Sequence, residues 1–152
     1  MTARELSDRF FDLSAEIDGV ADQLATLALI VVPRESAFPE DLPTDNCFKW
    51  GWSAMERHLR RIADELEGDG PKLEDLDNLG SEISSVADIL YVWQNLSKNS
   101  STVDIAFVGG INWDDAIWAI EQHLERIGDD VSMLGLRLKK EERDNAESKG
   151  QR

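Results

Sequence analysis

The chain has 152 residues, 41% of them hydrophobic, which is typical of one folded domain and not of a disordered protein. It carries 31 acidic and 16 basic residues, a formal net charge of -15, and no basic stripe, so we expect no direct nucleic-acid binding. No apolar stretch approaches the roughly 20 residues that a membrane span needs, and Cys47 has no second cysteine with which to form a disulfide. We therefore expect a cytoplasmic protein that does not enter the membrane.

Apolar residues recur in alternating steps of three and four in four segments of the chain. These segments begin at Leu6, Phe48, Leu76 and Trp113. Steps that average about 3.5 residues place the side chains along one narrow stripe of a helix. The pattern predicts four amphipathic helices whose apolar stripes meet in a single core.

Local signals set the ends of the first two predicted helices. Thr2 and Glu5 have the spacing of a capping box, and Pro33 ends the first helix. The second helix is expected from residues 44–45 to the residue before Gly68. Because the glycine-rich connector after it is short, the third helix must return antiparallel to the second.

The third helix is predicted from residue 72 to residue 96, and the fourth begins after Asn112, a favourable N-cap. We expect a single helical domain over 1–144. The polar residues 145–152 are expected to form a frayed tail.

Two long connectors, 33–43 and 97–110, join the remaining helices. The second has strand-like composition near 102–108, which predicts a short extended segment there. The simplest arrangement is an all-α four-helix bundle running up-down-up-down. In that arrangement both long connectors lie at one end, and the short turn and both termini lie at the other.

The tryptophans gather at the long-connector end of this bundle. Trp50 and Trp118 lie off the apolar stripe, whereas the other three tryptophans lie on it. The connectors could bury these two side chains, or the side chains could be exposed and contact a partner, since tryptophan is enriched at interface hot spots. We predict a partner-binding surface at this end, made of Trp50, Trp118, Asp104, Phe107 and Phe38.

Metal and cofactor motifs are missing from the sequence. Helical bundles that hold two metals use Glu-x-x-His pairs, but the residues three before His58 and His123 are Met55 and Ile120. No phosphate-binding loop or dinucleotide fingerprint is present. We therefore expect no metal, no cofactor and no catalytic residue.

Residues 87–92, Ala-Asp-Ile-Leu-Tyr-Val, resemble part of the MazG-type all-α nucleoside triphosphate pyrophosphohydrolases. That family holds magnesium with Glu-x-x-Glu and Glu-x-x-Asp pairs, so the resemblance implies a degenerate, magnesium-dependent member of this class. The chain departs from the pattern, because Ser85 stands three residues before Asp88 and Glu82 lies one turn earlier. The preceding helix offers the acids Asp64, Glu65 and Glu67.

The sequence favours a non-enzymatic protein-interaction module, such as an inhibitor, adaptor or regulatory partner. Its partner would be another protein, basic in character, and a homodimer is a second option because apolar stripes can pair between chains. One alternative is an acidic nucleic-acid mimic of the anti-restriction or anti-CRISPR type, although Arg57, Arg60 and Arg61 interrupt the acidic surface. The other alternative is the pyrophosphohydrolase.

Overall fold

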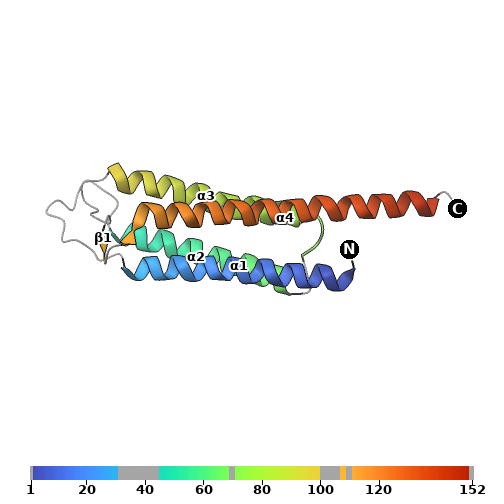
Figure 1. The fold of residues 1–152 in the computed structure, drawn as a ribbon, viewed down its shortest axis with the longest axis horizontal. Coiled ribbons are helices and arrows are strands. Elements are labelled where there is room, and N and C mark those ends of the chain that lie inside the picture. The colour runs from blue at the N-terminus through green and yellow to red at the C-terminus, as the bar shows by residue number, and fades with distance from the viewer. Residues whose placement is uncertain (1, 31–44, 69–70, 100–106, 109–110, 151–152) are drawn as a thin grey trace.

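The computed structural model describes residues 2–30, 45–68, 71–99, 107–108 and 111–150. Its helices are α1 (Ala3–Ile30), α2 (Asp45–Glu67), α3 (Leu76–Asn99) and α4 (Trp113–Gly150). Successive helices run in opposite directions, and both termini lie at the end away from the long connectors (Figure 1). The predicted all-α, up-down-up-down four-helix bundle is confirmed.

The helices form two close pairs, α1 with α2 and α3 with α4, which face each other across the core (Figure 1). Glycines explain the closeness of α3 and α4. A Cβ atom on Gly80 would lie 2.8 Å from the carbonyl oxygen of Gly128, and one on Gly128 would lie 2.9 Å from that of Gly80. The two backbones therefore meet at a point where no larger residue fits.

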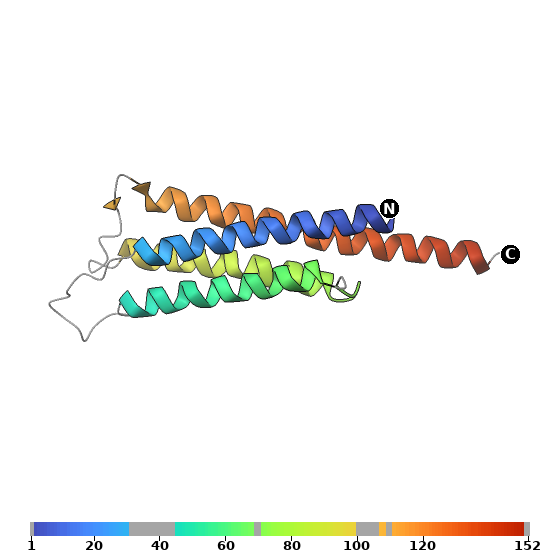
Figure 2. The same cartoon turned by 90° about the horizontal axis from the view of Figure 1, so that it is seen from below.

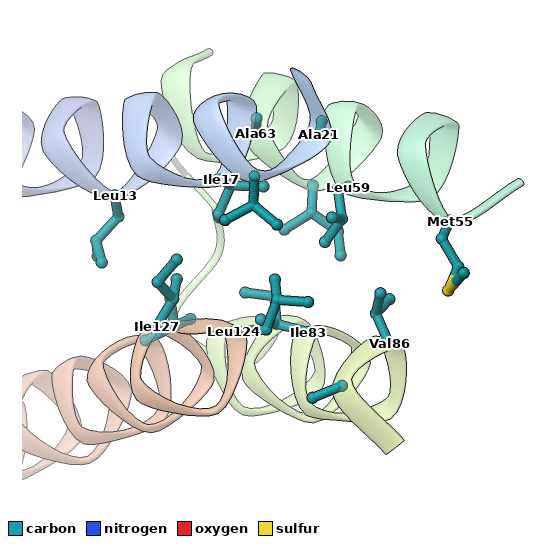
Figure 3. Close-up of a cluster of buried hydrophobic side chains, with 14 of the residues drawn as sticks. Leu13, Ile17, Ala21, Met55, Leu59, Ala63, Ile83, Val86, Leu124 and Ile127 are labelled. Carbon is teal, nitrogen blue, oxygen red and sulfur yellow. The ribbon is translucent and has the colours of Figure 1, made fainter. Parts of the chain in front are cut away.

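The apolar stripes form the core. Side chains of both pairs, among them Ile17 and Leu59 from one and Ile83 and Leu124 from the other, point toward one another in Figure 3. Every stripe residue whose side chain the structure describes is buried, except that Leu6 and Leu138 are partly buried against the core and Trp93 is half-buried. The ring of Trp93 lies against Gly51 of α2. Full burial of an aliphatic side chain is worth about 1.5–3 kcal/mol, so this core dominates the stability of the bundle.

The first turn of α1 has the predicted capping box. The Thr2 backbone N–H donates to Glu5 at 2.7 Å, and the Glu5 backbone N–H donates to the Thr2 hydroxyl at 3.2 Å. The backbone hydrogen bond from Thr2 and that from its side chain lower the pKa of Glu5. The two orphan amides of this helix start are thereby satisfied.

The start of α3 and the end of α4 differ from the prediction. α3 begins at Leu76 and not at Lys72, because Asp75, a better N-cap than lysine, accepts the first helical hydrogen bond from Leu79 at 2.9 Å. α4 continues to Gly150, so 145–150 is helical where we expected a frayed tail. Figure 2 shows α4 running past the first residues of α1.

Two short strands precede α4. β1 (Phe107–Val108) pairs antiparallel with β2 (Ile111–Asn112), with Phe107 opposite Asn112. Of the extended segment expected near 102–108, only these last two residues belong to the described chain. Among the described helices, none is long and apolar enough to cross a membrane.

Ion pairs join neighbouring helices all the way around the bundle. Among the described pairs are Arg60–Asp22 between α1 and α2, Arg61–Glu82 between α2 and α3, Lys139–Asp77 between α3 and α4, and Arg9–Asp130 and Arg126–Glu16 between α4 and α1. Their side chains are partly exposed, so each contributes little to stability. These pairs show that basic side chains lie next to acidic ones at the contacts between helices.

Candidate functional site

Trp118 lies on the outer surface of α4, near the long-connector end, and its side chain is 58% exposed. It is the one predicted site residue whose side chain the structure describes. Trp50 lies in α2 and Phe107 in β1, but their side chains fall outside the described part of the chain, as do Phe38 and Asp104 entirely. Their role in a surface remains a prediction.

Three further apolar side chains, Ile89, Tyr91 and Val92, are exposed on α3. They were not predicted as site residues, because only the tryptophans off the stripe were considered for the partner-binding surface. They follow the same signal, because Leu90 occupies the stripe and its neighbours on either side must point elsewhere. Considering every large apolar residue that lies off the stripe, and not only the tryptophans, would have identified these three residues.

The antiparallel register of α3 against α4 relates Tyr91 to Trp118. A Cβ atom on Gly128 would lie 2.6 Å from the hydroxyl oxygen of Ser84, which fixes these two residues as opposite one another. Two turns along each helix from that point come Tyr91 on α3 and Glu121 on α4. Tyr91 therefore lies at the level of Glu121, and Trp118 lies one turn farther along α4.

Three carboxylates accompany these aromatic residues. Burial, followed by the negative charges of Glu125 and Asp88, raises the pKa of the Glu121 carboxyl, so the three acids share one neighbourhood. We call the surface formed by Asp88, Tyr91, Trp118, Glu121 and Glu125 the α3–α4 outer face.

Glu121 is the unusual member of the α3–α4 outer face. Its side chain is only 8% exposed, and its Oε2 atom is buried without a hydrogen-bond partner. Glu125 accepts a hydrogen bond from the Gln122 amide at 3.2 Å. Within the described residues no base forms an ion pair with Asp88, Glu121 or Glu125. A buried carboxylate with an unpaired oxygen is costly, so it calls for an explanation.

The acids that suggested a magnesium site are arranged differently. Glu82 binds Arg61 and lies 3.3 Å from His58, and Arg61 also binds Glu65. In the part of the chain that the structure describes, no three His, Cys, Asp or Glu side chains converge closely enough to hold a metal ion. Asp88 instead lies close enough to Glu121 for its charge to affect the pKa of that carboxyl.

A groove of about 530 Å³ lies between α1 and α4 at the same end of the bundle. Its lining is mostly small and apolar, including Leu27, Ala116 and Ala119. Its charged rim residues are already paired, Asp22 with Arg60 and His123 with Glu16. Among the described residues that line the groove, none has a buried side-chain polar atom without a hydrogen-bond partner.

The sequence matches no family model, and comparisons with curated proteins and with solved structures find no similar protein. The exposed aromatic and acidic side chains of the α3–α4 outer face are therefore the basis for a functional proposal.

Proposed function

We propose that this protein is a non-enzymatic interaction module, an inhibitor, adaptor or regulatory partner, that binds another protein through the long-connector end of its bundle. The observation that supports this most is Trp118, a tryptophan that is 58% exposed on a helix and has Tyr91, itself 55% exposed, on the facing helix. Trp and Tyr are the residues most enriched among interface hot spots. Both stand on helices fixed by a fully buried core, so little conformational entropy is lost when they bind.

The position of these aromatic residues also supports the proposal. They occur where the bundle needs no further packing, since Leu90 and Ile117 already fill the core at this level. Val92, the next residue after Tyr91, is also exposed on α3, whereas Ile89, two turns after Glu82, lies on the side of α3 that faces α2. A cluster of exposed apolar side chains on a stable scaffold is typical of a protein-binding surface.

Affinity capture from the source cells, with Trp118→Ala compared against Phe11→Ala, tests the proposal. Phe11 is a matched control, because it is 59% exposed but lies on α1, away from the α3–α4 outer face. We expect the wild type and Phe11→Ala to retain the same partner and Trp118→Ala to weaken its binding by at least about tenfold, the effect of a hot-spot truncation.

Equal losses in both variants, or no loss in Trp118→Ala, would contradict the proposed surface. Magnesium-dependent turnover of a nucleoside triphosphate by the purified protein would favour the pyrophosphohydrolase instead. Competition between DNA and the protein for its captured partner would favour nucleic-acid mimicry.

A further inference from the structure

We propose that the α3–α4 outer face binds an arginine side chain carried by a basic segment of the partner protein. This inference rests on the proposed function and specifies the chemistry of the partner. The juxtaposition that carries it is a buried, unpaired carboxylate within about one helical turn of two exposed aromatic side chains.

The first step is the unsatisfied carboxylate. Glu121 is more than nine-tenths buried, its Oε2 has no hydrogen-bond partner, and it shares its surroundings with Asp88 and Glu125. A guanidinium group supplies five N–H donors and a full positive charge, so it can satisfy more than one carboxylate at once. Folding has already removed water from this carboxylate at a cost in free energy. A cation that pairs with it therefore gains the electrostatic attraction without adding that desolvation cost.

The second step is the aromatic surroundings. Tyr91 lies on α3 at the level of Glu121, Trp118 lies one turn farther along α4, and both side chains are more than half exposed. A guanidinium plane stacks on such rings and gains cation–π attraction, whereas a carboxylate or phosphate of a partner would be repelled here. Val92 offers an apolar contact next to this position.

The third step excludes a second copy of this chain as the occupant. The chain carries a net charge of -15, and many of its bases, such as Arg60, Arg61 and Arg126, already bind acids between helices. Two copies joined through this face would bring six carboxylates together without bases to neutralise them. A basic partner has the complementary charge.

The test uses a labelled alanine-based helical peptide with two arginines four residues apart and a leucine between them, titrated into the full chain by fluorescence anisotropy. We expect saturable binding that weakens about tenfold or more in Glu121→Gln, because one charge-assisted hydrogen bond is lost. Glu147→Gln is the matched control, since Glu147 is an exposed acid near the C-terminal end of α4, far from the face, and its change removes the same charge. We expect it to change the dissociation constant less than about twofold.

Two results of the titration would overturn the inference. One is an equal loss in Glu147→Gln, which would indicate general attraction to an acidic protein. The other is unchanged binding when glutamines replace the peptide's arginines. Light scattering adds a third, since a dimer that Trp118→Ala dissociates would make a second copy the occupant. If the peptide fails while partner capture still depends on Trp118, the arginine inference falls and the proposed function stands.

Discussion

The acidic residues Glu16 and Glu121, which lie on the two sides of α4, differ in whether a base pairs with them. On the side that faces α1, the Glu16 carboxylate accepts from Arg126 at 2.5 Å and lies 3.3 Å from His123, while Asp130 binds Arg9 at 2.9 Å. On the side that faces α3, Lys139 binds Asp77 near one end of the helix pair, but Glu121, farther toward the long connectors, has no basic partner among the described residues. The difference shows that this chain places bases where helices must be held together and leaves one acidic surface without them.

The pKa values of the two glutamates follow this difference. Burial alone would raise the pKa of Glu16, but hydrogen bonds from Arg126 and His123 outweigh it, so the pKa of Glu16 is lowered. The pKa of Glu121 is raised, because burial acts together with neighbouring negative charge. The pKa values of two glutamates in one bundle are therefore shifted in opposite directions, because one has basic partners and the other has none among the described residues.

The largest effect is expected from the close approach of α3 and α4 that forms the outer face. Gly128→Ala should lower the free energy of unfolding by about 2–3 kcal/mol, because the new methyl group would overlap the backbone of Gly80 and force the helices apart. Urea unfolding followed by circular dichroism measures it. Gly19→Ala is the control, since no atom lies within 4 Å of a Cβ there, and it should stabilise α1 by about 0.5–1 kcal/mol. A neutral Gly128→Ala would show that the pair is looser than described.

A smaller effect of opposite sign is expected at Glu121. Because its pKa is raised in the folded state, ionisation opposes folding, and its contribution to stability falls as the pH rises from about 4.5 through the folded-state value. Glu121→Gln should raise the free energy of unfolding by about 1 kcal/mol at pH 7.5 and by nearly nothing at pH 4. Equal stabilities of wild type and variant across this range would contradict the unpaired state of the carboxylate.

Glu16 should show the smallest effect, with the reverse dependence on pH. Its lowered pKa makes the ionised form stabilise the fold above about pH 4.5, and this contribution is lost as the pH falls through the folded-state value. Glu16→Gln should lower the free energy of unfolding by about 0.5 kcal/mol at pH 7.5, since the pair is partly exposed. The difference should shrink in 1 M sodium chloride, which screens exposed ion pairs. A variant as stable as the wild type at low salt would remove the contrast between the two sides of α4.

Much of the fold was predictable from the sequence because burial follows the spacing of apolar residues. The stripe predicted Leu13, Ile83 and Leu124 as core, and it left Trp118 outside. The start of α3 was wrong by four residues, because the apolar pattern alone does not choose between Lys72 and Asp75 as the start of the helix.

The acidic part of the candidate site could not be predicted. Asp88 and Glu121 lie on different helices, and no spacing in the sequence relates them. Their proximity follows from the register that Gly80 and Gly128 impose on α3 and α4. That register is a property of three-dimensional packing, and the sequence shows only two isolated glycines within helical patterns.

The placement of the chain ends has a practical consequence for how this protein can be displayed. α4 has 38 residues, a length of about 57 Å, and both termini lie at the end opposite Trp118 (Figure 1). A tag or surface tether at either terminus would therefore hold the bundle upright with the α3–α4 outer face away from the support. Immobilised protein should then bind as well as protein free in solution.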